Sequence, residues 1–188
     1  MSFTLLGILN SQAAGAGGAA AYDLLETTTL ASSASSVTFS GLGSYTDYNH
    51  LQLRMVVHSD NPSVPGFLRA VVNGDTGANY SRHELRGSGS SVTSSGLTGR
   101  SDAELGGISA DNAEADSYSA FVTDILDFSS TNKNTTFRTL QGYVNSQNTF
   151  IYFMSNGHFN TNSVTSLELT DPVANLSTGS RFSLYGVK

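Results

Sequence analysis

The sequence predicts an all-β protein, an antiparallel β-sandwich of jelly-roll type with an extended N-terminal arm. Three observations predict this class. From residue 22 onward, polar and apolar residues alternate with a period of two, as expected for half-buried strands. Residues typical of turns separate the alternating segments, and no segment after the arm has the 3.6-residue period of a helix. Nine or ten strands in roughly 165 residues are typical of a sandwich.

Residues 1–21 differ from the rest of the chain. An apolar run is followed by a tract of only Ala and Gly at positions 13–21. The first basic residue is Arg54, so a secretory signal is not expected, and the polar residues 10–12 end the apolar run too early for a membrane span. We interpret the segment as an arm that docks on a partner, with a tail without a role as the alternative. The predicted anchoring residues are Phe3, Leu5, Leu6, Ile8 and Leu9.

Residues 22–188 are predicted to form the sandwich domain. Within 50–59, Leu51, Leu53 and Met55 share one face, which predicts a strand with one buried side. The Asn-Gly pairs at 73–74 and 156–157 are interpreted as hairpin turns. The predicted strands are 24–30, 35–40, 50–59, 66–73, 80–86, 118–128, 135–144, 150–154, 164–169 and 180–187.

One long region, residues 87–117, is rich in Gly and Ser and shows no clear alternation. We predict a long loop here, with a short hairpin inside it as the alternative. Loops of this length in compact domains are usually functional or are held by partners.

Composition limits the partners. Charged residues make up 13% of the chain and the net charge is -6, so neither nucleic acid nor a membrane is an expected partner. There is no cysteine, which excludes disulfides, thiolate metal sites and a cysteine nucleophile. Of the nine basic residues, seven are arginine, a residue typical of interface ion pairs, which suggests a surface covered by neighbours, with plain compositional bias as the alternative.

No pattern of catalytic or metal-binding residues is found. A Gly-x-Ser-x-Gly motif is absent and the four histidines are dispersed. Asp124 and Asp127 fall on opposite faces of one predicted strand, and Glu84 is expected to pair with Arg82 or Arg86. Two oxygen-rich segments, 73–79 and 111–116, are only weak calcium candidates. The sequence therefore predicts a protein that is not an enzyme and that has no cofactor.

Several specific strings lie between about residue 22 and the C-terminus. They are LLETTTL at 24–30, VTFSGL at 37–42, YNHLQLR at 48–54, LRAVVNGDTGANYS at 68–81 and SRFSLYG at 180–186. In these strings the chain resembles a family of virion structural proteins from tailed bacteriophages, and the resemblance is weakest between 87 and 117. The resemblance implies a β-sandwich protein of the particle without enzymatic activity, found on capsids, necks or tail fibres.

The predicted function is therefore that of a structural component of a tailed-phage virion, either a capsid decoration protein or a tail-fibre protein. The expected partners are other copies of the chain, as a homotrimer, and other capsid, neck or tail proteins. The expected location is the virion, assembled in the host cytoplasm. The alternative is a receptor-binding module at a fibre tip that binds a glycan on the host surface. Its candidate contact residues are Tyr45, Tyr48, Asn112 and Tyr118.

Overall fold

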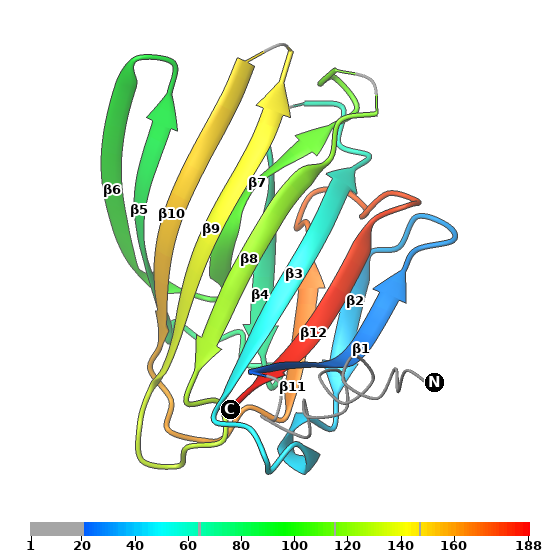
Figure 1. Cartoon of the computed structure of the whole chain (residues 1–188). Helices are drawn as coiled ribbons and strands as arrows, with labels where there is room; N and C mark the ends of the chain where they lie inside the picture. Colours follow the sequence, from blue (N-terminus) through cyan, green and yellow to red (C-terminus); the bar gives the residue numbers. More distant parts are fainter. Residues whose placement is uncertain (1–20, 64, 115, 147) are drawn as a thin grey trace, which may run out of the picture.

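The computed structural model describes residues 21–188, except residues 64, 115 and 147. The predicted anchoring residues at positions 3–9 lie outside the described residues. Within the described part, the chain forms twelve strands and one short 3-10 helix, η1 (Leu42–Ser44) (Figure 1). The strands are β1 (Tyr22–Thr29), β2 (Ser36–Ser40), β3 (His50–Ser59), β4 (Gly66–Val72), β5 (Tyr80–Ser88), β6 (Ser91–Arg100), β7 (Ala103–Ala110), β8 (Ser119–Leu126), β9 (Thr135–Asn145), β10 (Asn148–His158), β11 (Ser166–Thr170) and β12 (Arg181–Val187).

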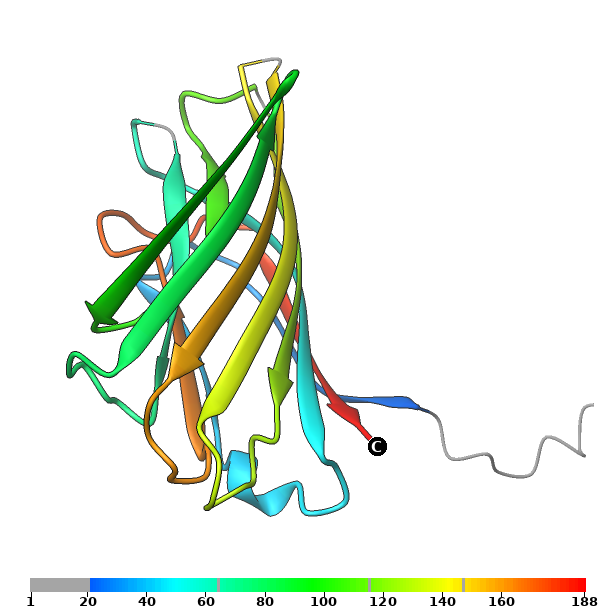
Figure 2. The ribbon, with the colours of Figure 1, turned by 90° about the vertical axis from the view of Figure 1, so that its left-hand side faces the viewer.

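The strands are arranged in two layers joined at one point. The eight-strand layer is antiparallel, in the order β1-β12-β3-β8-β9-β10-β5-β6. The four-strand layer, β2-β11-β4-β7, lies over one side of it and connects to it through a short parallel pairing of β7 with β3 (Figure 2). The predicted all-β class is thus confirmed, and the jelly-roll topology stays a prediction.

The hydrophobic core fills the space between the two layers. Leu53, Phe121 and Phe137 enter it from the eight-strand layer, and Leu68 and Leu105 enter it from the four-strand layer. The alternation in the sequence explains this placement, because every second side chain of β3, β8 and β9 faces the core. All ten predicted strands are present, with ends that shift by a few residues.

The predicted long loop at 87–117 is wrong. Most of this region is β6 and β7. Strand β6 returns along β5 as a hairpin and is exposed at nearly every position, whereas β7 is buried along its whole length. Neither strand alternates, because β6 is solvated on both faces and β7 is covered on both.

The two predicted Asn-Gly hairpin turns have different outcomes. Asn73 and Gly74 both have positive φ and do form a tight turn, but the turn carries the chain from β4 in one layer to β5 in the other. Asn156 and Gly157 lie inside β10, so that turn prediction is wrong. The Asn156 side chain is buried and exchanges two hydrogen bonds with the backbone of Glu104, which joins β10 to β7.

Candidate interaction surface

The eight-strand layer has one side turned away from the four-strand layer, which we call the outer face. Alternate residues of β8, β9, β10 and β5 point to it. The strand register places Val122 beside Leu140, Leu140 beside Phe153, and Phe153 beside Leu85. Each of these four side chains is between 41% and 52% exposed. They therefore form a continuous exposed apolar row across four strands.

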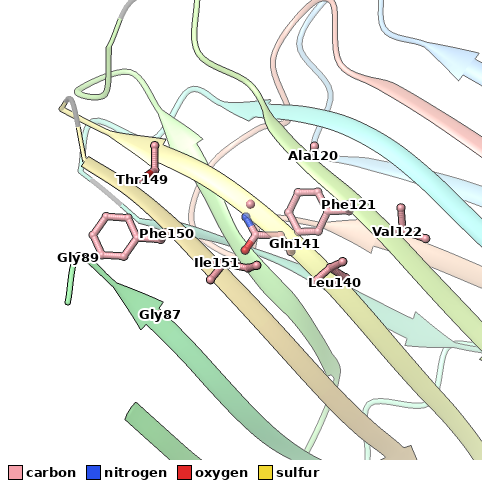
Figure 3. Close-up of a pocket in the computed structure, with 11 residues that line it drawn as sticks. Gly87, Gly89, Ala120, Phe121, Val122, Leu140, Gln141, Thr149, Phe150 and Ile151 are labelled. Atoms are coloured by element: carbon pink, nitrogen blue, oxygen red, sulfur yellow. The ribbon is translucent and has the colours of Figure 1, made fainter. Parts of the chain in front are cut away.

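A second row lies next to the first. In it, Ile151 has Gly142 on one side and Gly87 on the other, and Val92 follows on β6. Because the two glycines have no side chain, Ile151 projects between them and a groove of about 660 Å³ opens along Gly142 and Ala120 (Figure 3). We call the six large side chains of the two rows the apolar face. They are Leu85, Val92, Val122, Leu140, Ile151 and Phe153.

A chain of polar contacts borders the apolar face. Arg54 Nε donates to Gln52 Oε1 at 2.8 Å, and Gln52 Nε2 donates to Asp124 Oδ1 at 2.7 Å. The other oxygen of Asp124 accepts a hydrogen bond of 2.6 Å from Arg138 Nη2. The Arg54 guanidinium also lies over the Tyr185 ring, 4.7 Å from its centroid. Asp124 and Arg138 are therefore an ion pair within the subunit, whereas the Arg54 cation is held by an amide and by an aromatic ring.

A second set of charges lies between the layers. Glu104 of β7 is 4% exposed and accepts hydrogen bonds from Arg82 of β5 and from Arg100, the latter at 3.1 Å. Arg100 also donates to Asp102 at 2.7 Å, and Arg82 donates to Glu84 at 3.0 Å. The predicted pairing of Glu84 with Arg82 is confirmed. This cluster connects the β5–β6 hairpin to β7, which is a structural task.

The oxygen-rich segment 73–79 also has a structural task. Both carboxylate oxygens of Asp75 accept hydrogen bonds, from Gly77 N and the Asn79 amide, and His158 Nε2 lies 2.9 Å from Oδ2. The bond with His158 is the main cause that lowers the pKa of Asp75 to about 2. Burial raises the pKa of Tyr80, which stacks on His158, to about 12. These contacts fix the turn against β10.

The four predicted glycan contacts do not form one site. Tyr45 and Tyr48 precede β3, whereas Asn112 and Tyr118 precede β8 at the opposite end of that strand pair. The Tyr48 hydroxyl donates a hydrogen bond to Asp23 Oδ2 at 3.0 Å, and the Tyr118 hydroxyl donates one to Thr178 O at 3.0 Å. Of the four, only Asn112 has an exposed side chain that makes no hydrogen bond with the described part of the chain.

The sequence analysis did not identify the apolar face. A signal was present, because the segment 118–128 has large apolar residues on both of its alternating faces. The register that joins Val122, Leu140, Phe153 and Leu85 brings together positions 85 to 153, and alternation within single strands does not reveal it.

In comparisons with known proteins, no family model, curated protein or solved structure matches the chain. Among the described residues, no three His, Asp or Glu side chains are grouped to hold a metal ion. Within the part of the chain that the structure describes, no helix is long and apolar enough to cross a membrane.

Proposed function

We propose that the chain is a non-enzymatic structural component of a tailed-phage virion, as a capsid decoration or tail-fibre protein. The apolar face is the observation on which the proposal rests. A continuous apolar patch of this kind is as large as the largest patch on a typical soluble monomer, and such patches are often functional sites of association. A protein that works packed among other subunits accounts for it.

The chemistry of the groove supports a role without catalysis. Among the described residues, those that line it are apolar or uncharged, such as Phe121, Gln141 and Thr149. General acid–base or nucleophilic catalysis needs a titratable or activated group near the substrate. A groove of this composition is better suited to receiving side chains of another protein.

The resemblance of the strings at 68–81 and 180–186 to virion proteins supplies the setting. In that setting the protein is a homotrimer, contacts other capsid, neck or tail proteins, and is fastened by residues 1–21. The low charge and the preference for arginine over lysine fit a surface that is largely covered by neighbours. Its location is then the virion, after assembly in the host cytoplasm.

The test is to find the protein in particles. Phage particles are purified from the lysate of the host that expresses the chain, and its peptides are quantified by mass spectrometry. Antibodies against the purified chain are used with immunogold electron microscopy to locate it. We expect a fixed number of copies per particle at one position. Presence in the lysate but absence from purified particles would refute the virion role.

A further inference from the structure

We infer that a second copy of this chain packs its own outer face against the apolar face. The inference rests on the proposed structural role and names the partner. Both subunits would contribute the rows on β8, β9, β10 and β5, so that two eight-strand layers meet face to face. Such a contact is two-fold and does not close a trimer, so in the proposed homotrimer it would join subunits of two different trimers. Three properties of the surface favour a second copy of the chain as its partner: its area, its charge and its shape.

The area matches the apolar part of a stable interface. The six side chains are exposed between 41% for Val122 and 70% for Val92. With about 150–200 Å² per large side chain, these fractions amount to roughly 500 Å² of apolar surface. A standard interface buries about 800 Å² on each partner, of which roughly 56–65% is apolar. One copy of the apolar face therefore supplies the apolar share of one side of a standard dimer.

The charges on the outer face do not oppose self-association. The net charge of the chain is -6, so two random surfaces would repel each other. The apolar face itself contains no charged residue. At its border, Arg138 and Asp124 neutralise each other. Arg54, which the register places beside Val122 at the end of the row, is held by the Gln52 amide and by the rings of Tyr22 and Tyr185. The centres of the two surfaces can therefore approach without bringing a charge into the interface core.

The shape is complementary to itself. Ile151 forms a ridge between Gly87 and Gly142, and the groove runs beside it along Gly142 and Ala120. In two facing copies, the ridge of each can enter the groove of the other. Facing sheets pack about 10 Å apart by such interdigitation of side chains. The apolar face thus has the relief of an inner sheet surface.

The first test uses the full-length chain and sedimentation velocity over a dilution series. Leu140→Lys places a positive charge at the centre of the apolar row, on both copies of the proposed dimer. We expect the dissociation constant for self-association to rise roughly tenfold or more. The matched control is Val173→Lys, which changes an apolar side chain that is 73% exposed in a turn outside the eight-strand layer and should leave association unchanged.

The second test separates specific packing from general stickiness. A Cβ at Gly142 meets nothing closer than Phe150 O at 3.7 Å, so the subunit accommodates a Cβ there, and the two further methyl groups of Gly142→Val would extend from it on the side of the groove. It adds apolar surface but fills the groove. Specific packing predicts weaker self-association, again about tenfold, whereas non-specific adhesion predicts association that is equal or stronger. Circular dichroism confirms that each variant is folded.

The outcomes are distinct from those of the virion test. A wild-type chain that stays monomeric at all concentrations, or one whose association is unchanged by both Leu140→Lys and Gly142→Val, overturns the inference. Neither result bears on whether the protein is present in particles. Conversely, a dimer that is weakened by both variants supports the inference even where the particle experiment places the protein outside the virion.

Discussion

The two sides of β8, β9 and β10 are formed by alternating residues of the same strands, but they lie in different environments. On the inner side, Phe121, Phe137 and Tyr152 are almost fully buried. On the outer side, Val122, Leu140 and Phe153 are about half exposed. In an antiparallel sheet that is solvated on one side, the outer residues are normally polar. The difference shows that this sheet is apolar on both sides and covered, within the subunit, on only one.

Inner and outer side chains differ in what they contribute to the free energy of folding. An inner side chain stabilises the fold because its burial is complete within the subunit. An outer side chain of the same type gains little on folding and retains its apolar area for association. Substitutions on the inner side should therefore affect stability, and those on the outer side should affect assembly. The predictions below test that division, in order of decreasing effect on the free energy of unfolding.

The largest effect is expected for the charged cluster between the layers. Glu104→Ala removes the carboxylate that Arg82 and Arg100 share in a largely buried site, and leaves each with one other carboxylate, Glu84 or Asp102. The loss should therefore lie at the lower end of the roughly 3–5 kcal/mol that removing one partner of a buried ion pair costs. Urea denaturation should show this loss. Lys133→Ala, which breaks an exposed pair with Asp127, should cost about 1 kcal/mol or less. Equal costs for the two variants would mean that the cluster does not hold the layers together.

The next effect is expected where β12 packs against the loop that precedes β3. A methyl group at Gly186 would overlap the Tyr48 ring, and the displaced ring would lose its hydrogen bond to Asp23. Gly186→Ala should therefore lower stability by about 1–3 kcal/mol. Gly142→Ala is the matched control, because its methyl group meets only Phe150 O at 3.7 Å. Thermal unfolding that ranks the two variants the other way would contradict this packing.

Prediction from the sequence succeeded where the alternation of polar and apolar residues follows the two faces of a strand. Alternation identified ten strands, most clearly where one face lies in the core, as with Leu51, Leu53 and Met55 of β3. It failed at β6 and β7, whose two faces share the same environment, and at Asn156, where a turn-type residue serves as a buried link to Glu104. The apolar face could not be predicted, because its rows depend on the register between distant strands.

The virion assignment and the anchoring role of residues 1–21 stay predictions. They depend on the resemblance of short strings and on residues outside the described part of the chain. The glycan-binding alternative depended on Tyr45, Tyr48, Asn112 and Tyr118 lying together, and the fold separates them into two groups. No sequence pattern indicated this separation, because it follows from the antiparallel pairing of β3 with β8.

A smaller, pH-dependent effect is expected at Asp75. Its pKa is about 2 in the folded protein, below the ordinary value of 3.8, mainly because of the bond with His158. A carboxyl group with a lowered pKa stabilises the fold above its ordinary pKa, and this contribution is lost as the pH falls through the folded value. Asp75→Asn should therefore be less stable than wild type at pH 7, by about 1 kcal/mol, as expected for a partly solvated charged hydrogen bond.

The lowered pKa of Asp75 also determines how this difference in unfolding free energy should vary with pH. The gap in unfolding free energy between wild type and Asp75→Asn should be constant at neutral pH and should narrow between about pH 4 and pH 2. Urea denaturation at a series of pH values measures it. Asp111→Asn, in the exposed loop after β7, serves as the control. A gap that widens on acidification would mean that the bond with His158 does not stabilise the folded carboxylate.

The smallest effect on stability is expected on the outer face, and it tests the comparison most directly. Leu140→Ser removes a half-exposed side chain whose cross-strand neighbours, Val122 and Phe153, are themselves about half exposed, so the unfolding free energy should change by no more than about 0.5 kcal/mol. The measurement is made at a protein concentration below that of self-association, because dimerisation would add its own stabilisation. Three residues earlier on β9, on the inner side, Phe137→Ala should cost about 3–5 kcal/mol under the same conditions. If Leu140→Ser destabilised the isolated subunit by a similar amount, the outer side would be part of the subunit's own folding energetics. A negligible change would instead leave assembly as the reason for its apolar residues.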